Sequence, residues 1–261
     1  PLPAAYAQFL QAHGCPLLPM RYESAELAKI SINMCLVASV TTANTLAELC
    51  EHVGADWSEI SPALKLDRRI GPHAYLAPGL GIAGGNLERD LATVCELADR
   101  HGTDAGVVRA WIANSRHRSA WAARTIKSVL LDAHPQACVA VWGLAYKENT
   151  HSVKNSPSLA TLAALPGAVL RLYDPVVPAS AAGHDGAHAA ASALDALTGA
   201  DALMILTPWP QFRAIAPADI AAAMRGRVVL DPYAVLDSQA AAAAGLTLYT
   251  LGKGLPDPGH A

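Results

Sequence analysis

The stretch ACVAVWGLAYKENTHSVKNSPSLATLAALPGAVLRLYDP, residues 137–175, reads as a strand, a helix and a second strand. Residues 137–143 and 169–175 are short apolar runs, and SLATLAAL between them has the composition of a helix. Two more apolar runs, residues 201–207 and 227–232, continue the alternation. Strands that alternate with helices predict a doubly wound parallel sheet. The second half of the chain is therefore predicted to be a Rossmann-like α/β domain.

Ligands of such sheets bind beyond the carboxyl ends of the strands. In this chain those ends fall at Gly143–Asn149, Asp174 and Thr207–Trp209. Asp174 fits two roles equally well, because a carboxylate there could bind a ribose hydroxyl or could close the turn in YDP.

The first half of the chain, to about residue 133, carries helical signals instead. Ala4–His13 reads as a short helix. We expect Ser24 to cap a helix that runs to Val53, which at about 1.5 Å per residue is roughly 45 Å long. A helix of that length needs partners along it, so a dimer interface is a reasonable hypothesis. Further helices are expected from an Asp56–Glu59 capping box, from an Asn86 cap to Gly102, and from an Asp104 cap to about Leu131.

Composition limits the possible partners. The 261 residues have a net charge of −3 and no basic stripe, so nucleic acid is not expected. We find no uninterrupted apolar run of about 18 residues, so no membrane-spanning helix is expected. The 5 cysteines stand singly, which fits a reducing cytoplasm. His184 and His188 are four residues apart but lack a third ligand, so no metal site is expected.

The loop PGLGIAGGNLERD, residues 78–90, is rich in glycine and leads into an expected helix. Glycine has no Cβ and accepts a positive φ, so it lets backbone approach a ligand closely. The loop therefore raises the question of what lies against Gly84, Gly85 and Asn86.

Several stretches together resemble the UDP-glucose/GDP-mannose dehydrogenase family. They are SAELAKISINMCL, LDRRIGPH, PGLGIAGGNLERD, VWGLAYKENTHSVKNSPSL, RLYDP and DALMILTPWPQF, and they cover nearly the whole chain from Ser24 onward. The resemblance implies oxidation of the C6 alcohol of a nucleotide sugar to a carboxylate with two NAD molecules.

The resemblance also implies a domain order. Residues 1–23 would be the end of an N-terminal NAD-binding domain, residues 24–133 an all-α dimerisation domain, and residues 134–261 the nucleotide-sugar domain. NAD would then be bound mainly by a domain that this chain does not contain. A homodimer through the helix at 24–53 is expected.

The same resemblance assigns catalytic roles. Lys29 and Asn33 share a helix face, and the family places such a pair on the reacting hydroxyl and its oxyanion. A solvated lysine beside a polar neighbour is the alternative. Asp90 matches an aspartate that positions water, although an acid in the first turn of a helix also complements the helix dipole.

Asn86 departs from the family pattern. Aligned on Asp90, it stands where the family has a catalytic cysteine. A thiolate at a helix N-terminus attacks the aldehyde intermediate, whereas an asparagine amide is no useful nucleophile. Full four-electron oxidation by the family mechanism is therefore not expected of this chain.

The remaining site residues are also assigned by the resemblance. Five match substrate-binding positions: Arg69, which would reach the partner subunit's substrate, Tyr75, Leu76, Gly84 and Lys147. Gly85 and Lys154 match cofactor-facing positions. Other charges differ from the family pattern. The family's run with an acid and an arginine reads His151–Asn155 here, and its later D-G-R-N-like stretch reads Asp231–Ala234, without the arginine.

Two functional hypotheses stay open at this point. The chain belongs to a divergent NAD-dependent nucleotide-sugar dehydrogenase that stops after one oxidation, or that oxidises transiently. Alternatively, it is a catalytically silent subunit that binds the nucleotide sugar or serves as a scaffold.

Overall fold

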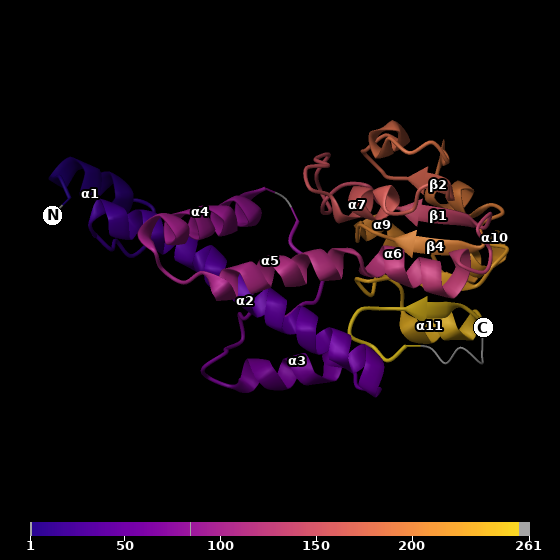
Figure 1. The fold of residues 1–261 in the computed structure, drawn as a ribbon, viewed down its shortest axis with the longest axis horizontal. Coiled ribbons are helices and arrows are strands. Elements are labelled where there is room, and N and C mark those ends of the chain that lie inside the picture. Colours follow the sequence, from indigo (N-terminus) through magenta and orange to yellow (C-terminus); the bar gives the residue numbers. More distant parts are fainter. Residues whose placement is uncertain (1, 84, 256–261) are drawn as a thin grey trace.

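The chain consists of a helical region followed by a sheet flanked by helices (Figure 1). A computed structural model describes residues 2–83 and 85–255. The helical region contains α1 (Ala4–Gln11), α2 (Tyr22–Val53), α3 (Trp57–Leu66), α4 (Asn86–His101), α5 (Gly106–Ser119) and α6 (Trp121–Ile126), which continues as a π-helical turn, Lys127–Leu131.

The described part of the second half holds a six-stranded sheet in the order β3-β2-β1-β4-β5-β6, with every pair parallel. This confirms the predicted doubly wound sheet. Its strands are β1 (Cys138–Trp142), β2 (Val169–Tyr173), β3 (Ala187–Ala189), β4 (Ala202–Ile205), β5 (Val228–Leu230) and β6 (Thr247–Tyr249). Its helices are α7 (Pro157–Ala163), α8 (Ala193–Leu197), α9 (Pro210–Arg213), α10 (Pro217–Ala223) and α11 (Ser238–Ala243).

The two central strands are apolar throughout because both of their faces are covered. Val139–Trp142 of β1 and the whole of β4 are buried. The Trp142 ring stacks on Phe212 at 5.0 Å between centroids. The edge strands β3 and β6, of three residues each, were not predicted.

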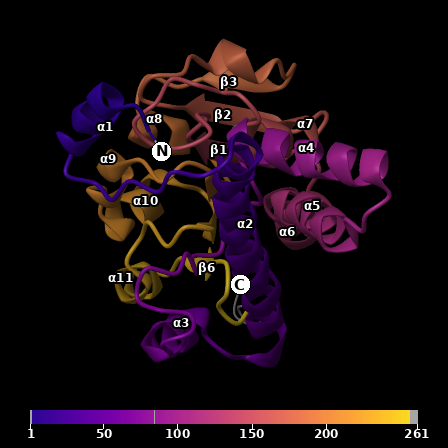
Figure 2. The same cartoon turned by 90° about the vertical axis from the view of Figure 1, so that its left-hand side faces the viewer.

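The helical region is organised around α2. Figure 2 shows α4 and α5 along one side of α2, with α3 near its C-terminal end. Gly54 ends α2 in the left-handed conformation, with φ of 74°. Asp56 caps α3, as predicted, by accepting a hydrogen bond from the Ser58 amide at 2.7 Å.

Three predicted helix ends are wrong. The helix α2 begins at Tyr22, with Arg21 as its N-cap, so Ser24 lies inside it. Gly85 is the N-cap of α4, and Asn86 is the first residue of the helix rather than its cap. The expected helix from Asp104 to Leu131 is interrupted at Ala120, although Asp104 does accept a hydrogen bond from the Gly106 amide.

By length and composition alone, α2 could cross a membrane. Its best window has a mean hydropathy of 1.3 and is 28% buried, which the search for uninterrupted apolar runs did not anticipate. One such helix is weak evidence for a span, because core helices have the same length and composition. Polar groups of α2, including Lys29, Asn33 and Glu51, bind side chains of other helices.

Ala234, in the loop after β5, has a φ of 50° and is exposed. The left-handed conformation is strained for alanine and free for glycine. We expect Ala234→Gly to raise the free energy of unfolding by about 0.5–1 kcal/mol, measured by urea denaturation. Ala242→Gly, at an exposed position inside α11, should lower it by about 1 kcal/mol. A change in the free energy of unfolding in the same direction for both variants would contradict strain at Ala234.

Candidate functional site

Three predicted catalytic residues meet where α2 and α4 pack together. Lys29 Nζ lies 3.0 Å and Asn33 Nδ2 lies 2.6 Å from Oδ2 of Asp90. The two donors are one turn apart on α2, so they reach the same carboxylate oxygen. Arg89, next to Asp90 on α4, lies 3.2 Å from the other oxygen, Oδ1. Asp90 is only 4% exposed. Residues about 60 positions apart in the sequence therefore form one polar cluster.

The cluster fixes the charge of Asp90. The hydrogen bond from Lys29 holds the pKa of Asp90 below its ordinary value of 3.8, and the hydrogen bonds from Asn33 and Arg89 add to this, whereas burial opposes it. An ionised carboxylate with three donors is suited to orienting them. The Lys29 side chain stays 61% exposed, so its ammonium can also reach a ligand.

Asp90→Asn should therefore destabilise the protein in a pH-dependent way. Because the pKa is lower in the folded chain, the ionised form stabilises the fold at neutral pH, and this contribution is lost as the pH falls through the folded pKa. We expect a loss of about 1–2 kcal/mol near pH 7, discounted because Lys29 is exposed. The gap between variant and wild type should narrow near pH 3, as measured by thermal denaturation. Asp132→Asn, at an exposed position, should change little, and a gap that is constant with pH would contradict the assignment.

A loop of the sheet domain packs against the start of α4. A Cβ built on Gly85 would lie 2.8 Å from Cε and 2.9 Å from Nζ of Lys154, so glycine lets this side chain lie against the backbone. Asn155 Nδ2 donates a hydrogen bond to Oε2 of Glu88. The two predicted cofactor residues, Gly85 and Lys154, are therefore neighbours. Gly84 lies outside the described residues.

Asn86 opens α4 one turn before Asp90, so the two residues lie on the same side of the helix. The Lys154 side chain lies against Gly85, directly before Asn86.

At the carboxyl edge of the sheet, Asp174 ties loops together. Its Oδ2 accepts hydrogen bonds from the Leu144 and Ala145 amides at 2.7 and 3.1 Å and from Trp209 Nε1 at 3.1 Å. Its Oδ1 accepts from the two amides that follow the turn, at 2.9 Å each. These contacts favour the turn role over a ribose contact. Lys147, in the loop after β1, is exposed, and its Nζ lies 5.6 Å from the centre of the Tyr146 ring.

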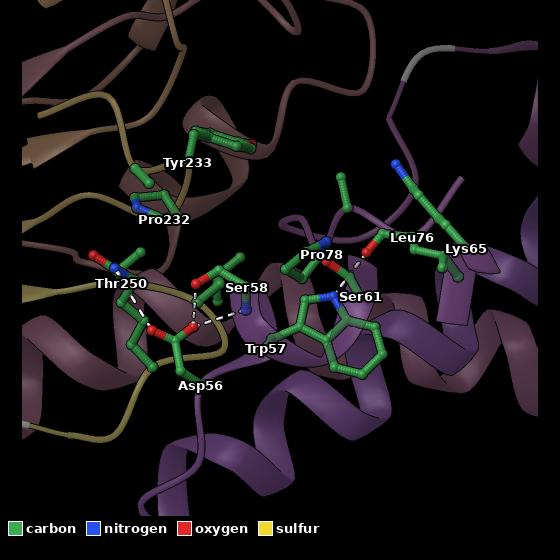
Figure 3. A pocket seen from close by; sticks show the side chains of 14 residues that line it. Asp56, Trp57, Ser58, Ser61, Lys65, Leu76, Pro78, Pro232, Tyr233 and Thr250 are labelled. Carbon is green, nitrogen blue, oxygen red and sulfur yellow. Dashed lines mark hydrogen bonds and ion pairs between the residues drawn. The ribbon is translucent and has the colours of Figure 1, made fainter. Parts of the chain in front are cut away.

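A cavity of about 320 Å³ lies between α3, residues 76–78 and the loops after β5 and β6. Leu76, a predicted substrate residue, lines it, and its carbonyl accepts a hydrogen bond from Trp57 Nε1 at 2.8 Å. Burial raises the pKa of Tyr233, whose hydroxyl lies against the Leu80 backbone amide. Figure 3 shows the α3 side chains of Trp57, Ser58, Ser61 and Lys65 together with Pro232, Tyr233 and Thr250 of the sheet domain.

Sequence reasoning missed most of this lining. The helix α3 carried only a capping signal, and β6, which leads to Thr250, was not predicted. The predicted substrate residues Tyr75 and Arg69 are exposed. Arg69 is held in its own loop by two hydrogen bonds to Asp67, at 3.0 and 2.7 Å.

Within residues 2–83 and 85–255, no group of three or more His, Cys, Asp or Glu side chains could hold a metal ion. His184 instead bonds the Leu165 carbonyl at 2.8 Å and accepts from the Gly186 amide. These contacts give His184 a structural role at the start of β3.

Comparison with known proteins assigns both regions to one family. Residues 23–116 match the central domain of the UDP-glucose/GDP-mannose dehydrogenase family, and residues 140–238 match the UDP binding domain of the same family. The UDP-glucose 6-dehydrogenase of Pseudomonas aeruginosa is 30% identical over 270 residues, covering 98% of this chain and 57% of that protein. That of Rhizobium meliloti is 32% identical over 210 residues, covering 79% of this chain and 48% of that protein.

Solved structures agree in fold. A UDP-glucose dehydrogenase from Pyrobaculum islandicum has a TM-score of 0.78 at 24% identity, covering 96% of this chain and 56% of that one. A UDP-D-ManNAc dehydrogenase from Pyrococcus horikoshii has a TM-score of 0.74 at 26% identity, covering 88% of this chain and 52% of that one. The chain thus spans about half the length of the relatives it matches. It belongs to the UDP-glucose/GDP-mannose dehydrogenase family and carries the family's central and UDP-binding domains.

Proposed function

We propose that this chain is the central and nucleotide-sugar-binding part of an NAD-dependent dehydrogenase that oxidises a CH–OH group of a nucleotide sugar. The observation that carries the proposal is the cluster of Lys29, Asn33 and Asp90, which joins two helices around one buried carboxylate. Membership of a family of nucleotide-sugar dehydrogenases supports it.

In this proposal each residue of the cluster has its own role in the reaction. The Lys29 ammonium and the Asn33 amide hold the sugar hydroxyl and stabilise the negative charge that develops on its oxygen. Asp90 orients both donors and, with its low pKa, stays ionised while it does so. The nucleotide end of the substrate would lie toward the carboxyl edge of the sheet, where Leu76 and Tyr233 line the cavity and Lys147 is exposed.

NAD, when bound, supplies the hydride acceptor. We propose that a domain outside this chain holds most of it. The Lys154 ammonium beside Gly85 fits a diphosphate group in charge, and the missing Cβ leaves the backbone accessible there. These two residues would therefore contribute the cofactor contacts of this chain.

The second oxidation needs a nucleophile that Asn86 does not provide. We propose that Asn86 occupies the position of the family's catalytic cysteine and that the reaction stops after one hydride, at an aldehyde or ketone. In that step a C–H and an O–H bond of the sugar would break and a C=O bond would form, the hydride leaving to the bound cofactor and the proton to solvent. A silent nucleotide-sugar-binding subunit is the second candidate, favoured by Tyr233 and His151 at positions where the family carries charge.

We also propose that the protein forms a homodimer through α2 and works in the cytoplasm. Apolar side chains are exposed along α2 in a single copy of the chain, namely Leu27, Ile32, Leu36, Leu46, Leu49 and Val53. A second copy would cover such a stripe. The domain limits at residues 23/24 and 133/134 remain predictions.

The binding part of the proposal is tested with the whole protein, including any segment that precedes Pro1. Titration calorimetry with UDP-glucose, GDP-mannose and free UDP should give saturable binding of at least one nucleotide sugar. Tyr233→Ala should weaken that binding, whereas Ala242→Gly, in the exposed face of α11, should not. If the protein binds none of these three ligands, the proposed nucleotide-sugar site is contradicted. If the two variants bind with equal affinity, Tyr233 does not contribute to the site.

A further inference from the structure

A single buried carboxylate joins the helical region to the sheet. Glu51, near the end of α2, is 4% exposed. Its Oε1 accepts from Arg118 Nη2 on α5 at 2.8 Å and from the Gly252 amide at 3.0 Å. Its Oε2 accepts from Trp121 Nε1 on α6 at 3.0 Å. One side chain therefore links α2, α5 and α6 to the segment that follows β6.

Gly252 can occupy this position only because it is glycine. Its φ is 76°, and a Cβ there would lie 2.7 Å from Cβ of Trp57 and 3.2 Å from Cβ of Ala47. Its carbonyl accepts a hydrogen bond from the Trp57 amide at 2.8 Å. The segment after β6 is thus held between α2 and α3 by both backbone groups of one residue.

A second bond anchors the same segment further along. The Leu255 amide donates to the backbone carbonyl of Glu51 at 3.1 Å. Lys253 Nζ lies 3.9 Å from Asp56, the cap of α3. Glu51 therefore fixes residues 250–255 at two points, through its side chain and through its backbone carbonyl.

This segment forms one wall of the 320 Å³ cavity. Thr250, Leu251 and Lys253 line the cavity, whereas Glu51 does not. We propose that Glu51 is a positioning residue for ligand binding: through Gly252 it sets the cavity wall, and through Arg118 and Trp121 it ties that wall to the helices. The identity of the ligand, a nucleoside diphosphate, rests on the proposed function; the anchoring itself does not.

The test compares two variants that both lack the buried charge pair. In Glu51→Gln with Arg118→Met, the Gln carbonyl oxygen can still accept the Gly252 hydrogen bond. In Glu51→Leu with Arg118→Met, no acceptor remains. Hydrogen exchange of the residue 250–255 amides and the affinity for UDP are measured in both, with Asp99→Asn as a control that breaks the exposed Asp99–Arg109 pair.

We expect the leucine variant to lose protection at 250–255 and to bind UDP about tenfold more weakly, while the glutamine variant and the control stay close to wild type. Equal protection and affinity in the leucine and glutamine variants would overturn the proposal. If the wild type binds no UDP, the ligand assignment fails and the exchange data alone decide the anchoring. Should the leucine variant not fold, the wild type decides, because its Gly252 amide must exchange as slowly as the sheet core; exchange at the rate of an exposed loop would overturn the proposal.

Discussion

Replacing Arg118 by methionine is expected to lower the free energy of unfolding by about 3–5 kcal/mol, because it leaves the carboxylate of Glu51 buried without its charged partner. Arg118 has no exposed surface, and its Nη2 lies 2.8 Å from Glu51. Glu51 would keep only two neutral donors, Trp121 Nε1 and the Gly252 amide. Such a loss is a large fraction of the stability of a typical domain.

Urea denaturation of the variant measures this loss. Arg109→Met removes an ion pair of similar length, 2.6 Å between Arg109 and Asp99, but both of its side chains are at least half exposed. It should therefore cost far less than Arg118→Met, because solvent screens an exposed ion pair. A loss below about 1 kcal/mol for Arg118→Met would contradict the role given to the buried pair.

Replacing Lys29 by methionine in the whole protein is expected to reduce kcat by about 10²–10³-fold with any nucleotide sugar that the wild type oxidises. The variant lacks the ammonium that stabilises the developing alkoxide. It also leaves Asp90 with one donor fewer, so the pKa of Asp90 should rise toward its ordinary value and the activity profile should shift on its acidic side.

Lys127→Met is the matched control, since Lys127 is exposed on the π-helical turn far along the chain from α2. It should retain wild-type turnover. Unfolding curves of both variants separate loss of catalysis from loss of fold. A Lys29→Met protein with kcat within about threefold of wild type would remove Lys29 from the reaction, because a single electrostatic donor of this kind is worth far more.

The sequence alone predicted the sheet well and the junctions poorly. The strands β1, β2, β4 and β5 were predicted from apolar runs, whereas the edge strands β3 and β6 were not. Length alone does not separate them, because β5 also has three residues. Helix caps were misplaced where several polar or glycine residues compete, as at Gly85 and Asn86.

The candidate site divides in the same way. The pairing of Lys29 with Asn33 follows from their spacing on a helix. The family resemblance gave Asp90 a role in the same reaction, but the contact of both residues with Asp90, about 60 positions away, was not predicted. The Glu51 junction carried no sequence signal at all. Its partners lie on α5, α6 and the segment after β6, and only packing brings Arg118, Trp121 and Gly252 to one carboxylate.

The central claim is that the whole protein oxidises a nucleotide sugar by a single hydride step. The most direct test incubates it with NAD and a panel of UDP- and GDP-sugars, and follows NADH and the mass of the sugar together. The account predicts one NADH per sugar and a product that has lost two hydrogens. Two NADH with a uronate would contradict the role given to Asn86, and no NADH with any sugar of the panel would contradict the assignment as a dehydrogenase.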